Sequence, residues 1–174
     1  MPIRTIQIFS CDSPSEFKQR LFQWSQQFET IVWLDSNNHH QQYTSFDGCL
    51  AVEEFTSIKT DYHGAFEKLK EYQSYTKDYI FGYISYDVKN DTEQLSSSNF
   101  DGLDFSDLYF FQPQKLVFIK GNIIEFHYLK MIEHTNTHLI NRVFVESENS
   151  SRLKPTYSRT QFRRQDRQVV CDHP

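Results

Sequence analysis

The sequence predicts an α+β fold, a mainly antiparallel β-sheet sandwich with two or more helices packed outside it. Neighbouring β-prone runs are separated by short turn signals, as in antiparallel sheets. Two segments, 14–27 and 62–75, repeat apolar residues at helical spacing. Phe, Tyr and Trp make up 16% of the 174 residues, so large side chains are available for a core despite a mean hydropathy of −0.64.

Charge divides the chain into two parts. Residues 1–151 carry 12 Lys+Arg against 21 Asp+Glu, whereas residues 152–174 carry six against two. We expect 1–151 to form one domain and 152–174 to be a basic tail. The tail lacks the interleaved aromatic residues of a nucleic-acid-binding arm, and the net charge of −5 gives no reason to expect a nucleic-acid partner. An unpacked tail is the favoured interpretation.

The cysteines and the apolar runs indicate the compartment. Cys11, Cys49 and Cys171 are odd in number and lack metal-ligand spacing, which suits a reducing cytosol. We interpret Cys49 as a small buried hydrophobe. No apolar run has the length of a signal peptide or of a membrane span. The prediction is a soluble cytoplasmic protein with no membrane partner.

The first elements are a strand and a helix. Residues 5–9 alternate, with Ile6 and Ile8 expected to point inward. Ser13-Pro14-Ser15-Glu16 is a helix start with a capping serine and a capping-box glutamate. The following apolar stripe predicts one buried helix face: Phe17, Leu21, Trp24 and Phe28.

Residues 31–55 predict strand, polar connection, strand. An apolar run ends at Leu34-Asp35-Ser36, six polar residues follow, and aromatic and aliphatic residues resume at Tyr43. We interpret Glu53-Glu54 as solvation of the second strand's end rather than an acid–base pair.

The next segments predict a helix, a strand and a loop. After the helix 62–75, residues 79–86 predict a central strand covered on both faces, in which Gly82 marks a bulge or a close backbone approach. Residues 87–103 are polar and predict a long loop.

The last clear elements form a hairpin. Residues 108–111 predict a short buried piece that Pro113 ends. The runs 115–120 and 123–129 flank a Gly-Asn pair suited to a type II′ turn. Residues 138–145 fit either a strand or a short helix.

No catalytic constellation is visible. The chain has no Gly-x-Ser-x-Gly elbow and no phosphate-binding glycine loop. His134 and His138 are four apart, but no glutamate follows His134 as in zincins. We therefore expect no catalytic residue, no metal ligand and no cofactor in this chain.

Five short motifs follow one another in the order of one enzyme family. Leu34-Asp35-Ser36 and Tyr43-Thr44-Ser45-Phe46-Asp47 resemble its Leu-Leu-(Glu or His)-Ser run and the Tyr-Ser-Arg-Phe-Asp-like run that follows at this spacing. Phe81-Gly82-Tyr83-Ile84-Ser85-Tyr86-Asp87 is similar to its Gly-aromatic-x-(Gly or Ser)-Tyr-Asp strand. Phe100-Asp101-Gly102-Leu103 with Asp107-Leu108-Tyr109-Phe110-Phe111 resembles its Asp-Phe-Pro-Asp-Leu-Tyr-Phe-Phe run. The family is component I of aminodeoxychorismate synthase (p-aminobenzoate synthase) and anthranilate synthase.

The resemblance covers about residues 5–130 and favours the aminodeoxychorismate branch. It implies an enzyme that converts chorismate and ammonia to 4-amino-4-deoxychorismate for folate synthesis, with Mg²⁺ and a glutamine amidotransferase subunit (component II) that delivers ammonia. In that family the catalytic residues and the Mg²⁺ ligands belong to a second, chorismate-binding domain, which has no counterpart here. Residues 154–162 resemble the lead-in to that domain, so we expect an N-terminal portion that is inactive alone.

The resemblance also implies a pocket for L-tryptophan. The residues that match its lining are Leu34, Ser36, Tyr43, Thr44, Ser45 and Phe46. Two positions depart from the family pattern, because Ser45 replaces a frequent Arg and Asp35 replaces Glu or His. Three alternatives remain open: the N-terminal regulatory domain of anthranilate synthase, a free-standing non-catalytic binding domain, and a hairpin without a ligand.

Overall fold

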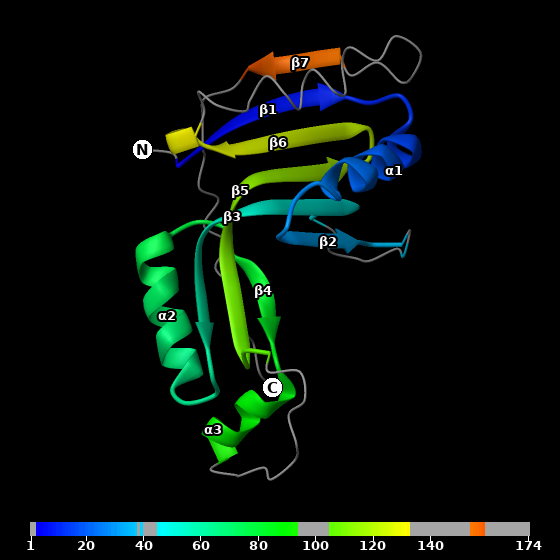
Figure 1. The fold of residues 1–174 in the computed structure, drawn as a ribbon. Coiled ribbons are helices and arrows are strands. Elements are labelled where there is room, and N and C mark those ends of the chain that lie inside the picture. Colours follow the sequence, from blue (N-terminus) through cyan, green and yellow to red (C-terminus); the bar gives the residue numbers. More distant parts are fainter. Residues whose placement is uncertain (1–2, 38, 40–44, 94–104, 133–153, 159–174) are drawn as a thin grey trace, which may run out of the picture.

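The structure is a computed structural model that describes residues 3–37, 39, 45–93, 105–132 and the backbone of 154–158. Seven strands form one antiparallel sheet in the order β2-β3-β5-β6-β1-β7, and β4 pairs with β5 beside that path (Figure 1). The predicted α+β class is confirmed. All the described strands belong to this one sheet, so the sandwich arrangement is not confirmed.

The elements have the following bounds. The strands are β1 (Arg4–Ser10), β2 (Ile31–Asp35), β3 (Gly48–Thr60), β4 (Phe81–Ile84), β5 (Leu108–Lys120), β6 (Ile123–Leu129) and β7 (Lys154–Ser158). The helices are α1 (Pro14–Ser25), α2 (Ala65–Thr76) and α3 (Lys89–Glu93), and the 3₁₀ turns are η1 (Tyr86–Val88) and η2 (Lys130–Ile132).

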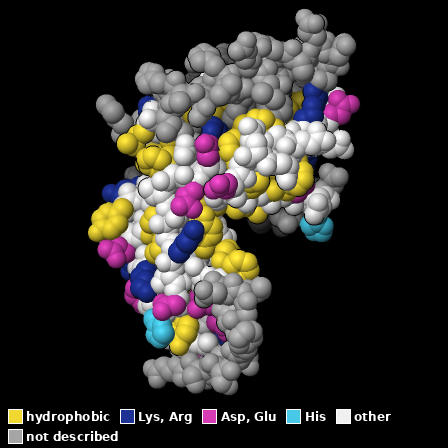
Figure 2. Space-filling model, in the orientation of Figure 1, with side chains coloured by type: hydrophobic (Ala, Val, Ile, Leu, Met, Phe, Trp, Pro, Cys, Tyr) yellow, Lys and Arg dark blue, Asp and Glu magenta, His cyan; other side chains and the backbone are white. Residues whose placement is uncertain are grey.

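The sheet is bent where its two longest strands cross the middle of the molecule. β3 and β5 pair over almost their whole length, but the register shifts between Glu54 and Thr56, opposite Pro113. Glu53 beside this bulge has φ of +64°. Both strands curve there and run from the upper sheet into a lower arm with β4 and α2 (Figure 1). The bend leaves the molecule hollowed on one side between these two parts (Figure 2).

Proline is tolerated in β5 because it lies at this irregularity, where its missing N–H removes no regular ladder bond. The prediction that Pro113 ends a short piece was therefore wrong, because β5 continues through it to Lys120.

The main core lies between α1 and the upper sheet. Phe17 and Leu21 of α1 are buried as predicted, with Trp24 and Phe28 packed at the margin. The strand residues of this core are Phe9, Leu50, Val52, Val117, Ile119, Ile124, Phe126 and Tyr128.

The inward direction of β1 was predicted wrongly. Phe9 is buried under α1, with its ring centroid 5.5 Å from that of Phe126, whereas Ile6 and Ile8 are only partly buried. Alternate strand residues face opposite sides of a sheet, so the aromatic residue sets which side faces the helix.

A second core cluster lies on the sheet face opposite α1. Cys49 and Ala51 alternate with Leu50 and Val52 and therefore point to this other face. Their buried neighbours are Phe111, Leu116 and Phe118. Cys49 is fully buried, as predicted, and desolvation raises the pKa of its thiol to about 12.

Both predicted hairpin-like pairs are confirmed. β2 runs antiparallel to β3, with Asp35 opposite Gly48. β5 and β6 join through Gly121, whose φ of +56° glycine adopts without steric cost.

Three local expectations were wrong. β4 is a four-residue edge strand that is mostly exposed, not a covered central one. Residues 87–93 of the predicted loop belong to η1 and α3. Ser13 makes no side-chain cap, because its φ of −132° and ψ of 75° leave only its carbonyl to accept from the Phe17 N–H at 3.1 Å.

The remaining expectations concern the histidine pair, the segment after it and the C-terminal tail. His134, His138 and the ambiguous segment 138–145 lie outside the described residues. Part of the predicted tail is a strand, since β7 pairs antiparallel with β1. No helix within the described ranges is long and apolar enough to cross a membrane.

Candidate functional site

The connection from β2 to β3 is fixed by Asp47. The Ser36 N–H donates to the Asp47 carbonyl at 3.0 Å, and the Asp47 N–H donates to the Ile119 carbonyl at 2.7 Å. The Gly121 N–H donates to Asp47 Oδ2 at 2.5 Å. These bonds hold the end of β2 against the β5–β6 turn, so the backbone beside Ser36 has a defined position.

Lys18 of α1 holds the same end of β2 from the helix side. Its Nζ donates to Asp35 Oδ1 at 2.9 Å and to the Asp47 carbonyl at 3.2 Å. Burial disfavours the ionised Asp35, but hydrogen bonds from Lys18 and from the Asn37 N–H outweigh it and lower the pKa of the carboxyl. Asp35, where the resembling family has Glu or His, is thus engaged with α1.

The structure places three of the predicted pocket residues at the same end of the β2–β3 pair. Leu34 is 43% exposed on the face opposite α1, and the Phe46 ring lies 5.6 Å from the Phe118 ring in the cluster on that face. The Ser36 carbonyl accepts from the His39 N–H at 2.8 Å, so both of its backbone groups are used within the connection. Ser45 is exposed, and the predicted Tyr43 and Thr44 lie outside the described residues.

This end of β2 can offer two kinds of contact. Leu34 and Phe46 present apolar surface. The Ser36 hydroxyl, which has no partner among the described residues, can donate one hydrogen bond and accept up to two. Apolar walls with a few placed polar groups are typical of small-molecule sites. The arrangement is chemically suited to a flat apolar ligand with a polar end.

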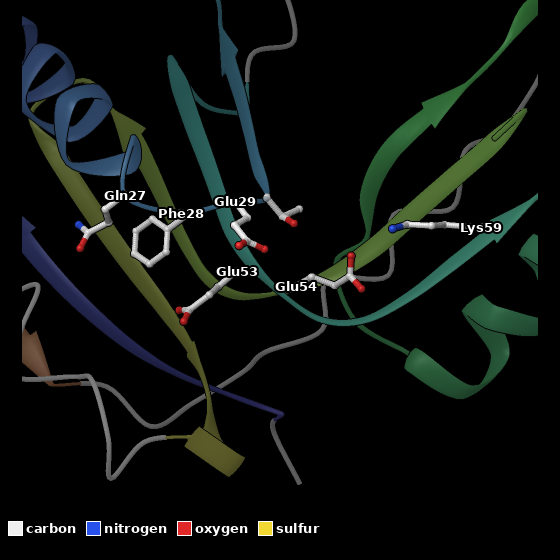
Figure 3. A pocket seen from close by; sticks show the side chains of 7 residues that line it. Gln27, Phe28, Glu29, Glu53, Glu54 and Lys59 are labelled. Carbon is white, nitrogen blue, oxygen red and sulfur yellow. The ribbon is translucent and has the colours of Figure 1, made fainter. Parts of the chain in front are cut away.

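The other end of β2 borders a groove that no sequence pattern predicted. Two pockets, of about 510 and 590 Å³, share Glu29, Thr30 and Lys59 as lining residues. We call them together the bend groove. Its charged end is also lined by Gln27, Phe28, Glu53 and Glu54 (Figure 3). Its apolar end is also lined by Ile31, Val32, Gly82, Tyr83, Phe105, Ser106, Tyr109 and Phe111.

Glu53 and Glu54 lie at the bulge, in the middle of β3, so their interpretation as strand-end solvation was wrong. Glu53 forms an ion pair with Lys115, which is 4% exposed and whose Nζ lies 5.0 Å from the Phe28 ring centroid. Glu54 accepts hydrogen bonds at 2.6 Å from the Ser57 and Tyr109 hydroxyls.

These contacts shift the pKa values of Glu54 and Tyr109 in the groove. The bonds from Ser57 and Tyr109 lower the pKa of Glu54, so it is ionised at neutral pH. Burial, followed by the bond to Glu54, raises the pKa of Tyr109 to about 12. Lys59 Nζ lies 4.8 Å from the Tyr109 ring centroid, and its side chain points toward Glu54 (Figure 3).

Sequence signals for the groove are few, because its lining comes from segments far apart in the chain. The local signals of the bulge are the glutamate doublet inside one β-prone run and Pro113 inside another. Among the described residues, no three His, Cys, Asp or Glu side chains are grouped to hold a metal ion.

Comparisons with protein-family models, curated proteins and solved structures found no match for this chain.

Proposed function

We propose that this chain is the N-terminal scaffold and tryptophan-pocket portion of an aminodeoxychorismate synthase component I-like protein. The order and spacing of its motifs support the proposal, from Leu34-Asp35-Ser36 to Asp107-Leu108-Tyr109-Phe110-Phe111. The chorismate chemistry then belongs to a chorismate-binding domain that docks on this one. A glutamine amidotransferase subunit supplies ammonia, and the product enters p-aminobenzoate and folate synthesis.

One observation carries the pocket. Leu34, Ser36 and Phe46 come from two sides of the β2–β3 connection and lie at the same end of the β2–β3 pair. L-Tryptophan has an indole that packs on aliphatic and aromatic side chains, and an amino acid end that bonds to hydroxyl and backbone groups. The indole contacts Leu34 and Phe46, and the Ser36 hydroxyl bonds the ligand's polar end.

The buried thiols support a cytoplasmic location. Cys11 and Cys49 are both free and buried in the structure. Proteins of a reducing compartment keep such cysteines unpaired. We therefore place the protein in the cytoplasm, where its proposed partners belong.

Calorimetric titration of L-tryptophan into the 174-residue chain tests the pocket. We expect saturable binding, which Phe46→Ala abolishes because the indole loses its aromatic contact. Phe66→Ala is the matched control, since Phe66 is 43% exposed on α2 and belongs to the lower arm. Equal effects of the two substitutions, or no binding at millimolar tryptophan, contradict the pocket.

A further inference from the structure

The bend groove is separate from the proposed tryptophan pocket. The groove is lined by Ile31 at the start of β2, whereas Ser36 follows its end. Five strand residues rise about 3.3 Å each, which separates the two places by roughly 17 Å. A ligand in the groove would leave Ser36 and Phe46 free.

The charged end of the groove has an excess of negative charge. Three carboxylates line it, those of Glu29, Glu53 and Glu54, against the single ammonium of Lys59. Glu53 is neutralised by Lys115, and Glu54 is held by two hydroxyl donors with Lys59 across from it. The remaining carboxylate therefore determines the charge of the ligand that the site attracts.

That carboxylate is Glu29, an exposed residue between α1 and β2. It has no partner among the described residues, and it lines both pockets. An unengaged carboxylate beside two other glutamates favours a cation, and its place where the pockets join fixes where the cation binds.

The other end of the groove has exposed aromatic surface. Phe105 is 70% exposed and Tyr83 is 42% exposed, and the Tyr83 ring lies 5.9 Å from the Tyr109 ring. Gly82 also lines this end, and its lack of a Cβ lets β4 approach the β5 backbone at Tyr109 closely. Aromatic faces beside a cation-attracting group match an amine that carries a flat apolar body.

We propose that the bend groove is a binding site for a small organic ammonium compound with an aromatic body. The ammonium group pairs with Glu29, and the ring packs on Tyr83 and Phe105. The site does not depend on the tryptophan proposal, because the two places share no residue.

Phenethylamine titrated into the ¹⁵N-labelled chain tests this site. We expect saturable amide shifts at Thr30, Lys59 and Tyr83, and about threefold to fivefold weaker binding of 2-phenylethanol, which has the same ring and chain without the charge. Glu29→Gln should weaken phenethylamine binding about threefold to fivefold, the size of an exposed ion pair. Glu67→Gln on α2 is the matched control and should leave binding unchanged.

Phe105→Ala probes the aromatic end, and because Phe105 is mostly exposed the variant should keep its fold. It should weaken both probes alike, whereas Glu29→Gln should weaken only the amine. Equal binding of the amine and the alcohol, equal effects of the two glutamine variants, or shifts outside the groove each overturn the proposal. L-Tryptophan shifts at Ser36 and Asp47 report on the other pocket, so the failure of one site is distinguishable from the failure of the other.

Discussion

Arg4 and Asp78 are 74 positions apart in the sequence and form a buried ion pair, with Arg4 Nη2 2.8 Å from Asp78 Oδ2. Their side chains are 1% and 6% exposed. Arg4 Nη2 also donates to the Pro113 carbonyl at 2.6 Å, and Asp78 accepts from Gln112 Nε2 at 2.7 Å. The pair therefore connects the start of β1 and the α2–β4 connection to the bend of β5.

Replacing Arg4 by Met should lower the free energy of unfolding by about 3–5 kcal/mol. The substitution leaves the Asp78 carboxylate buried without its cation, although it still accepts from Gln112, and it leaves the Pro113 carbonyl without the Arg4 donor. Urea unfolding followed by tryptophan fluorescence measures the loss. Arg20→Met is the control, because Arg20 and Glu16 lie 3.7 Å apart with side chains 29% and 65% exposed, and such a pair should contribute less than about 1 kcal/mol. Similar losses in the two variants would show that the buried pair does not hold the bend.

Arg4 also shows what local sequence patterns predict and what they do not. The helix α1 and the β5–β6 hairpin were predicted because their signals, an apolar stripe and a Gly-Asn turn, lie within a few residues. The partners of Arg4 lie far along the chain, so nothing near residue 4 indicates a buried cation. The same reason explains β4, whose apolar run resembles a central strand although it pairs only with β5.

The two candidate sites also differ in how far apart in the sequence their residues lie. The proposed pocket at Leu34, Ser36 and Phe46 could be predicted because the motif that carries the resemblance lies within one hairpin-like pair. The bend groove was missed because its lining joins β2, β3, β4 and β5 across the bulge. An alternating sequence pattern predicts which side chains of one strand face the core, but it does not predict where a long strand bends.

Gly82→Ala should destabilise the lower arm by about 1–3 kcal/mol, the usual cost of overpacking. A Cβ at this position would run into the Tyr109 carbonyl and lie 2.7 Å from the Cα of Phe110, both of them backbone atoms with little room to move. Amide hydrogen exchange should accelerate in β4 and stay unchanged in β6.

Gly48→Ala is the control for Gly82. Its Cβ would lie 3.3 Å from Lys18 Cε and 3.4 Å from Ile119 Cδ1, which are side-chain atoms that can shift. It should therefore cost less than Gly82→Ala. The reverse order of the two losses would contradict the close approach of β4 and β5.

Glu125 should make stability depend on pH in the acid range. A hydrogen bond from His127 and the nearby Lys120 ammonium lower the pKa of Glu125 from 4.5 to about 2. A depressed carboxyl pKa stabilises the fold above pH 4.5, and this contribution is lost as the pH falls toward 2. The difference in urea midpoint between the wild type and Glu125→Gln should be largest above pH 4.5 and shrink toward pH 2. A difference that is constant across this range would show that Glu125 is not stabilised as a carboxylate.

Lys77 offers a substitution that should stabilise the protein. It ends α2 with φ of +48° and ψ of 35°, and its N–H donates to the Gln73 carbonyl at 3.1 Å. A residue with a Cβ is strained by about 1–2 kcal/mol in this left-handed conformation, whereas glycine adopts it freely but loses more backbone entropy on folding. Lys77→Gly should therefore raise the free energy of unfolding by up to about 1 kcal/mol.

The control for Lys77 is the same change inside the helix. Lys70 is exposed within α2, where glycine should cost about 1 kcal/mol. Urea unfolding of both variants at one pH gives two changes of opposite sign, because only position 77 has a positive φ. A loss of stability in Lys77→Gly as large as that in Lys70→Gly would mean that α2 continues through Lys77 in solution instead of ending there.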